Sequence, residues 1–248
     1  MKPYSNVTFD FNGRAVVVTG GTSGIGHGIA RRFQAAGAAV TVTGTRASAT
    51  DYDEDLSGFL YASLEMRDAT AVEDFAAGLD EVDVLVNNAG TAIRMPEGLE
   101  PDGFADNIEI NLNAVYQLSY ALRPRLAESR GSIINIASMT SYFSSPRVPG
   151  YGASKAGIMQ LTQSLAGAWA EDGIRVNALA PGWITSRMTA PVQGNEGLNA
   201  TVVGRTPLGR WGAPDEVAGG ALFLASEAAA FVTGVTLPVD GGFSSCGV

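Results

Sequence analysis

The chain has 248 residues, a formal net charge of −9, and 46% apolar against 17% charged residues. This composition supports a sizeable apolar core and argues against intrinsic disorder. The acidic balance disfavours nucleic-acid binding, and no apolar run approaches the roughly 20 residues that cross a bilayer.

The sequence shows no sign of a division into several domains. We find no internal repeat, charge block or Pro/Ser-rich linker, so we expect a single domain over residues 1–248. Residues 1–14 hold no apolar segment of the kind that a secretory signal carries, and we therefore expect a cytoplasmic protein. The only cysteine, Cys246, has no partner for an intrachain disulfide and no histidine or carboxylate cluster beside it. We interpret it as a bystander thiol.

Short apolar runs alternate with stretches of helical spacing along the chain. The runs that predict buried strands are Ala15–Thr19, Val40–Thr43, Val82–Asn87, Ser132–Ala137, Arg175–Ala180 and Val235–Val239. The stretches that predict helices are Gly26–Ala36, Ala69–Leu79, Gly103–Ala127, Tyr151–Glu171 and Pro214–Ala225. Such alternation is typical of βαβ units. It predicts an α/β fold of the Rossmann type, with a doubly wound parallel sheet and helices on both faces.

The connection after the second predicted strand differs from the others. The stretch "SATDYDEDLSGF", residues 48–59, is short and acidic, so we expect an abbreviated crossover with at most a stub of helix. Its carboxylates lack the spacing of a cation site. The only histidine, His27, has no second histidine near it, so a surface or capping role fits it better than metal binding. We therefore predict no metal site.

The stretch "TGGTSGIG", Thr19–Gly26, follows the first predicted strand and opens the first predicted helix. Its spacing, Gly20-x-x-x-Gly24-x-Gly26, is one residue wider than the usual dinucleotide motif. Glycines let a pyrophosphate approach the backbone, and the free N–H groups of a helix N-terminus attract phosphate. The order of strand, loop and helix favours a bound dinucleotide over a turn without a ligand.

Five segments, in order, resemble the short-chain dehydrogenase/reductase family, in particular its 3-oxoacyl-carrier-protein-reductase-like branch. They are "TGGTSGIG" at 19–26, "NNAG" at 87–90, "YGASK" at 151–155, "PG" at 181–182 and "VDGG" at 239–242. The resemblance covers nearly the whole chain. It implies an NAD(P)(H)-dependent oxidoreductase acting on CH–OH groups. It also implies a homotetramer built through the two long helices and the C-terminal strand.

A tyrosine and a lysine stand four residues apart in one predicted helix, so both side chains project from the same face. A free tyrosine has a pKa of about 10. An ammonium beside Tyr151 favours its phenolate, so we expect Lys155 to lower that pKa toward neutrality. Such pairs are common on helix surfaces, and the pair alone does not establish a catalytic site.

Two further residues strengthen the catalytic interpretation. Ser138 follows a predicted strand and precedes Tyr151 by thirteen residues, which is the family's spacing for its catalytic serine. A hydroxyl at this end of a strand faces the ligand crevice and can polarise a carbonyl. The resemblance also implies that Asn111 bends its helix and holds a proton-relay water, with Asn113 as the competing choice. The predicted tetrad is Asn111, Ser138, Tyr151 and Lys155.

The end of the second predicted strand bears on the choice of cofactor. NAD-preferring folds place an acidic residue there to accept from the ribose 2′-OH. This chain has Gly44, followed by Thr45 and Arg46, which can bind a 2′-phosphate. Ser23, where many NADP-using relatives carry a basic residue, argues the other way. We predict NADP(H), with NAD(H) as the alternative.

The resemblance implies a set of cofactor-binding positions and a set of substrate-binding positions. The expected cofactor-binding residues are Gly20, Thr22, Ser23, Gly24, Ile25, Gly26, Gly44, Thr45, Arg46, Glu65, Met66, Asn88, Ala89, Gly90, Tyr151, Lys155, Pro181, Gly182, Ile184 and Thr185. Glu65 is expected to contact the adenine and Thr185 the carboxamide. The expected substrate-binding residues are Ile93, Arg94, Ser138, Tyr142, Arg147, Trp183 and Met188, with Met95 and Phe143 beside them. We expect residues 183–211 to form a mobile lid.

We predict hydride transfer between NADP(H) and a ketone or secondary alcohol, with Tyr151 as the general acid/base. Most of the pocket residues suit an apolar substrate, while the two arginines leave room for an acidic group. One alternative is a 3-oxoacyl-[acyl-carrier-protein] reductase, for which Arg123, Arg125 and Arg130 offer a basic docking patch. Another is a catalytically silent nucleotide-binding regulatory protein, against which the complete tetrad argues. We expect a small-molecule carbonyl or alcohol partner, no nucleic acid and no membrane.

Overall fold

Seven parallel strands form one sheet in a computed structural model that describes residues 7–245. Their order across the sheet is β3-β2-β1-β4-β5-β6-β7. The strands are β1 (Ala15–Val18), β2 (Ala39–Gly44), β3 (Leu60–Ser63), β4 (Val84–Asn87), β5 (Ser132–Ile136), β6 (Arg175–Pro181) and β7 (Thr236–Val239). The predicted α/β fold with a doubly wound parallel sheet is confirmed. Cys246 lies outside the described residues.

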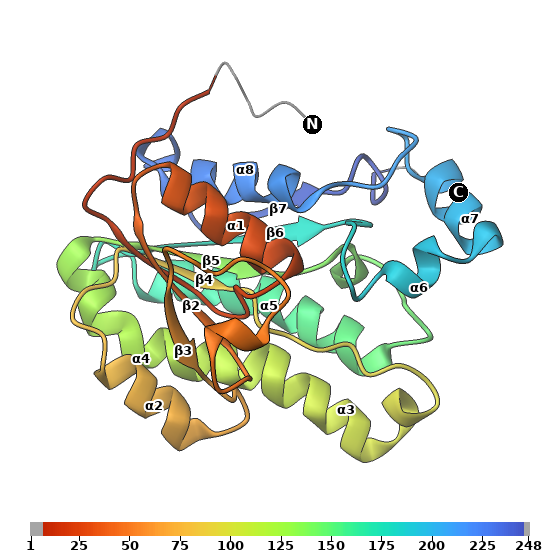
Figure 1. Ribbon diagram of the computed structural model, residues 1–248, viewed down its shortest axis with the longest axis horizontal. Coiled ribbons are helices and arrows are strands. Elements are labelled where there is room, and N and C mark those ends of the chain that lie inside the picture. The colour runs from red at the N-terminus through yellow and green to blue at the C-terminus, as the bar shows by residue number, and fades with distance from the viewer. Residues whose placement is uncertain (1–6, 246–248) are drawn as a thin grey trace.

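Helices cover both faces of this sheet (Figure 1). The longer ones are α1 (Gly24–Ala35), α2 (Ala69–Ala77), α3 (Pro101–Ile108), α4 (Ala114–Ser129), α5 (Pro149–Ala168), α7 (Glu196–Arg205) and α8 (Pro214–Ala225). Helices α1 and α8 lie on one face, and α2, α4 and α5 lie on the other. Within the described residues, no helix is long and apolar enough to cross a membrane.

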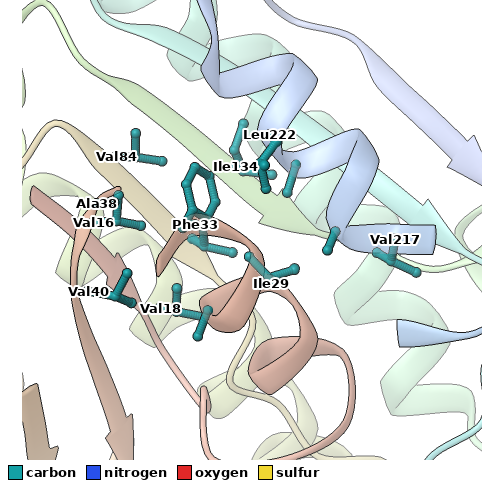
Figure 2. Packing of buried hydrophobic residues seen from close by; sticks show 14 of the residues in the cluster. Val16, Val18, Ile29, Phe33, Ala38, Val40, Val84, Ile134, Val217 and Leu222 are labelled. Carbon is teal, nitrogen blue, oxygen red and sulfur yellow. The ribbon is translucent and has the colours of Figure 1, made fainter. Parts of the chain in front are cut away.

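The core divides into two layers because successive strand residues point to opposite faces of a sheet. In β1, Val16 and Val18 face α1 and α8, while Val17 faces the other helices. Figure 2 shows the first layer, in which Phe33 of α1 lies among the valines of β1 and Leu222 of α8. These packed layers hold the strand ends rigidly, and the strand ends carry the site.

One strand was not predicted. Strand β3 pairs with β2 at the edge of the sheet, and Leu60 is 68% exposed. An edge strand needs no continuous apolar run, because part of its surface faces water. The connection that precedes it holds only a single 3-10 turn, Ala49–Asp51, so the abbreviated crossover that we expected is confirmed.

The predicted helix Gly103–Ala127 is interrupted. Helix α3 ends at Ile108, a π-helical turn spans Glu109–Asn113, and α4 begins at Ala114. A π turn inserts an extra residue into the helical ladder and is frequent at functional sites. Asn111 sits within this turn.

Residues 183–211 contain regular structure rather than an open loop. They hold α6 (Ala190–Gln193) and α7, and Ile184 forms an isolated bridge with Gly212. Thr189 Oγ1 accepts from Ser186 N at 3.0 Å and donates to Ile184 O at 2.7 Å. The mobility of this lid stays a prediction.

Candidate active site

The strand order reverses between β1 and β4, which opens a crevice at their carboxyl ends. Side chains from the two following loops cross-link there. Thr19 Oγ1 accepts from the backbone N–H groups of Asn88 and Ala89, each at 3.0 Å. Asn88 Nδ2 donates to the carbonyls of Thr19 at 2.9 Å and Gly20 at 3.0 Å. The "NNAG" segment therefore holds the glycine loop in place.

The glycine loop has the geometry that close approach of a ligand requires. Gly20 and Gly24 have φ values of 61° and 55°, in the left-handed region that favours glycine. A Cβ at Gly26 would lie 3.0 Å from Asn88 Cγ and closer still to its amide nitrogen. Asn88 fills the space beside Gly26, so glycine lets the loop pack closely against the "NNAG" segment.

A cavity of about 660 Å³ follows this loop along the strand ends. Its lining includes all the predicted cofactor-binding residues except Pro181, Gly182, Ile184 and Thr185. The residues that the sequence reasoning missed are Thr43, Tyr52, Leu64, Arg67, Thr91, Ile110, Ile136, Ser186 and Arg187. Met188, predicted for the substrate, also lines it. The cavity joins the glycine loop to Tyr151 and Lys155.

The structure places Ser186, and not the predicted Thr185, on the cavity wall. The side chain of Thr185 is exposed, while Ser186 lines the cavity. A Cβ at Gly24 would lie 3.4 Å from Ser186 Cβ, so this serine sits beside the glycine loop. The segment is extended, with Thr185 N donating to Gly212 O at 2.9 Å. Neighbouring side chains of an extended segment point to opposite sides, so a shift of one residue changes the hydroxyl that faces the cavity.

Asn111 is fully buried and completely hydrogen-bonded. Its Oδ1 accepts from Thr91 N at 2.8 Å, and its Nδ2 donates to Thr91 O at 2.8 Å and to Ser154 Oγ at 3.0 Å. These bonds join the π turn to the loop after β4 and to α5. Asn113, the competing choice, instead donates to Glu109 Oε2 on the exposed surface. The structure therefore favours Asn111 as the residue that positions the site.

Lys155 is buried, with 4% of its surface exposed, and its ammonium donates to Ile136 O at 2.6 Å. Burial lowers the pKa of Lys155 to about 8. A Cβ at Gly90 would lie 2.9 Å from Asn111 Oδ1 and 3.7 Å from Lys155 Nζ. Glycine at position 90 therefore leaves open the space between Asn111 and Lys155.

Tyr151 lies on the same face of α5, with its ring centroid 5.7 Å from Lys155 Nζ. Burial raises the pKa of Tyr151, and the Ser138 hydroxyl opposes that rise. Our expectation that Lys155 lowers this pKa is therefore not met by the protein alone. The Lys155 ammonium lies near the ring but donates its hydrogen bond to Ile136 O. The burial of Tyr151 therefore outweighs the charge of Lys155 in its effect on the pKa of Tyr151.

Ser138 stands where β5 gives way to a 3-10 turn, Met139–Ser141. Its Oγ accepts from Thr140 N at 3.1 Å, which fixes the side chain and leaves its hydroxyl proton free to donate. The influence of this hydroxyl on the pKa of Tyr151 places the two groups near each other. The four tetrad residues come from three chain segments, the π turn, the end of β5 and α5, and of the four Tyr151 and Lys155 line the cavity.

The predicted substrate-binding residues do not line one common cavity, because of the seven only Met188 lines the cofactor cavity. Arg94 Nη2 donates to Met188 O at 2.9 Å, which links the loop after β4 to the lid. Trp183 instead lines a second cavity of about 420 Å³ with residues of β7, and its ring meets that of Trp211 edge-on at 5.4 Å. Trp183 is thus not on the wall of the cofactor cavity, because the lid folds it against its own C-terminal end.

The sequence suggested a surface or capping role for His27, but the structure buries its side chain. Its Nε2 lies 3.2 Å from Asp55 O, and its Nδ1 lies 3.8 Å from Glu54 Oε2. The acidic connection covers this helix face, so the imidazole serves to hold that connection. Between residues 7 and 245, no group of His, Cys, Asp and Glu side chains is arranged to hold a metal ion.

The residues present fit a dinucleotide. The glycine loop lines the cavity, the N-terminus of α1 adds free N–H groups, and the cavity extends to Gly44 and Glu65. Gly20–Gly26 would hold the pyrophosphate. Residues 44–46 would hold the adenosine ribose, and Lys155 would hold the nicotinamide ribose.

Comparisons with known proteins agree with this geometry. The sequence model of a family described as enoyl-(acyl carrier protein) reductase matches residues 20–244. The chain is 39% identical over 251 residues to 2-dehydro-3-deoxy-D-gluconate 5-dehydrogenase of Bacillus subtilis (strain 168), covering 98% of this chain and 99% of that one. It is 38% identical over 247 residues to the L-tagatose-forming galactitol 2-dehydrogenase of Cereibacter sphaeroides, with 95% and 97% covered. Gluconate 5-dehydrogenase from Burkholderia cenocepacia J2315, solved with NADP and tartrate, has a TM-score of 0.87 and 32% identity, with 96% and 98% covered.

Proposed function

The chain belongs to the short-chain dehydrogenase/reductase family, and from this premise we propose that it oxidises a secondary alcohol of a polyhydroxylated acid, or reduces the matching ketone. It is an oxidoreductase that acts on CH–OH groups, and NADP(H) is its favoured cofactor. The observation that carries the proposal is the placement of Tyr151 and Lys155 on the wall of the dinucleotide cavity, with the Ser138 hydroxyl beside Tyr151 and with Arg94 bonded to Met188 of the same wall.

Each tetrad residue has a chemical task. When bound, the nicotinamide supplies or accepts the hydride. Ser138 donates its free hydroxyl proton to the substrate oxygen, which orients the reacting carbon and stabilises charge on that oxygen. Tyr151 transfers the proton at the same oxygen. Lys155 stabilises the phenolate as it forms, and Asn111 keeps the loop after β4 and helix α5 in register.

Two arginines support an acidic substrate. Arg94 and Arg147 are both exposed, and Met95 N donates to Arg147 O at 3.1 Å, so their segments adjoin. Among the described residues, neither guanidinium pairs with a carboxylate, although the chain carries a net charge of −9. A carboxylate is a suitable partner for such a guanidinium. Two of the similar proteins are named for sugar-acid substrates, and one was solved with tartrate, a hydroxy acid.

The test is a panel of substrates with NADP⁺ or NADPH: D-gluconate, 2-dehydro-3-deoxy-D-gluconate, galactitol and an acetoacetyl thioester. We expect turnover with a sugar acid, and a KM that Arg94→Ala raises about tenfold or more, as loss of a charge-assisted hydrogen bond predicts. The same variant should leave the KM for galactitol unchanged. Turnover of the thioester but of no sugar acid would contradict this choice of substrate, and binding without turnover would favour the silent regulatory protein.

The structure supports the 3-oxoacyl-[acyl-carrier-protein] reductase alternative less well than the sequence does. Arg123 pairs with Asp172 at 2.7 Å, and Arg125 donates to the carbonyls of Leu79 and Ala77. Both guanidinium groups are thereby held by their own protein. Only Arg130 of the expected patch stays exposed. One exposed arginine offers little to a strongly acidic carrier protein.

We also propose a cytoplasmic homotetramer, as the family resemblance implies. Exposed aromatic side chains support an interface on α4, where Tyr116 is 45% and Tyr120 58% exposed. Their rings lie 6.1 Å apart. Light scattering coupled to gel filtration measures the mass directly, and a monomer would contradict the proposal.

A further inference from the structure

A tyrosine from the acidic connection occupies the space beside the last residue of β2. A Cβ at Gly44 would lie 2.7 Å from Thr22 Cγ2 and closer still to the hydroxyl oxygen of Tyr52. No side chain fits at position 44 while Tyr52 keeps this place. An acidic residue there is the feature of NAD-preferring folds. In this chain a phenol hydroxyl takes its place.

The Tyr52 hydroxyl is held by hydrogen bonds with its neighbours. Arg46 N donates to Tyr52 Oη at 2.9 Å, and Tyr61 Oη lies 3.4 Å away. Burial works to raise the pKa of Tyr52, but hydrogen bonds with Tyr61, the Arg46 N–H, Thr45 and Thr22 together lower it. A phenol surrounded in this way is polarised and is a stronger donor to an anion.

The same cluster fixes Arg46. Tyr61 Oη donates to Arg46 O, and the Arg46 guanidinium lies 4.8 Å from the centroid of the Tyr52 ring. Stacking on an aromatic ring orients a guanidinium. Arg46 and the Tyr52 hydroxyl therefore form one unit on the cavity wall, where both residues, Gly44 and Thr45 are found together.

The carboxylates that flank Tyr52 have partners of their own. Asp51 accepts from Ser48 N at 3.0 Å, and Asp53 pairs with Arg187 of the lid at 3.2 Å. Glu54 lies 3.8 Å from His27, and Asp55 accepts from Ser57 N at 2.9 Å. These contacts hold the four carboxylates, while Tyr52 and Arg46 line the cavity.

We propose that Tyr52 is a specificity-determining residue for the cofactor, whose hydroxyl donates to the 2′-phosphate of NADP(H) together with Thr45 and Arg46. The inference rests on the proposed function in one respect, since it requires that a dinucleotide binds in this cavity. It adds a reason for glycine at position 44, which removes a negative charge and also leaves room for the phenol. The hydroxyl contributes to phosphate recognition through the donor it presents, and not to hydride transfer.

Calorimetric titration with adenosine 2′,5′-bisphosphate and with AMP tests this without any turnover. We expect Tyr52→Phe to weaken binding of the bisphosphate about tenfold, as loss of a hydrogen bond to a charged group predicts. Binding of AMP, which lacks the 2′-phosphate, should stay within about twofold, since the donor has no partner there. Thr50→Val, which removes a hydroxyl from the same connection but does not line the cavity, is the control and should change neither affinity.

Other outcomes overturn the inference in distinguishable ways. Tighter binding of the bisphosphate to Tyr52→Phe or Tyr52→Ala would show that the tyrosine blocks the phosphate. Equal weakening of both nucleotides would show a general structural role. Failure of the wild-type protein to bind either nucleotide would overturn the proposed function as well, whereas binding that Tyr52→Phe leaves unaltered would overturn this inference alone.

Discussion

Asn111 and Ser154 are joined by a hydrogen bond of 3.0 Å from the amide nitrogen of one to the hydroxyl oxygen of the other. The bond is buried and ties the π turn to α5 one residue before Lys155. Ser154 Oγ in turn donates to Tyr151 O at 2.8 Å. The position of the tyrosine and lysine on α5 is therefore coupled to the loop that Asn111 holds.

Asn111→Ala should destabilise the fold by about 2 kcal/mol, because it leaves the N–H and C=O of Thr91 unpaired in a buried place. Ser154→Ala, which removes one partner of Asn111, should cost about 1 kcal/mol. Urea unfolding measures both. If Asn111 only supports the fold, kcat of the variant falls in proportion to the fraction of protein that is unfolded. A fall in kcat in a fully folded variant would indicate that Asn111 takes a direct part in the proton relay.

Tyr151→Phe should lower kcat by about 10²- to 10⁴-fold, the range typical of general acid/base catalysis. Affinity for NADPH should stay the same, because the ring and its packing are kept. Steady-state kinetics and a fluorescence titration give the two numbers. Activity that survives in the variant would remove Tyr151 from the proton transfer.

The pKa of Lys155, about 8, is open to direct measurement. The chain has two lysines, Lys2 and Lys155, so a sample labelled with ¹³C at lysine Cε gives two signals, and Lys2→Arg assigns them. We expect the Lys155 signal to titrate near pH 8, well below the ordinary lysine value of about 10.4. Two ordinary titrations would contradict the burial of the ammonium.

The same pKa predicts how stability depends on pH. Between pH 8 and the ordinary lysine value, the unfolded chain binds a proton at Lys155 and the folded chain does not, so stability rises with pH. The rise from pH 8 to pH 10 should be about 2 kcal/mol, beyond which the raised pKa of Tyr151 acts in the opposite sense. Urea unfolding at several pH values measures it, and Lys155→Met should lack it.

Gly26→Ala should destabilise the protein by about 1–3 kcal/mol, as overpacking of a filled site does. The added methyl group would meet the amide of Asn88, which also secures the loop, so nucleotide affinity should fall as well. Gly204→Ala in α7 is the matched control. Nothing lies within 4 Å of a Cβ there, so we expect a gain of about 0.5–1 kcal/mol from helix propensity. Thermal unfolding distinguishes the two, and equal effects would contradict the crowding at Gly26.

Much of the site could be predicted because its signals are local. Tyr151 and Lys155 share a helix face through a spacing of four residues, and Ser138 follows a buried apolar run. The glycine loop stands between a strand and a helix, which is enough to place it at a strand end. Strand β3 escaped prediction because it is a short edge strand, Leu60–Ser63, without a β-branched residue.

The sequence by itself determined the parallel α/β fold and the place of the glycine loop, since both follow from residues close together in the chain, and through the family resemblance it predicted the tetrad. Only the tertiary structure decided that Tyr52 lies against Gly44, that Ser186 replaces Thr185 on the cavity wall, and that His27 is buried. It also decided the π turn at Asn111. These features depend on hydrogen bonds and packing between segments far apart in the chain, which no local spacing encodes.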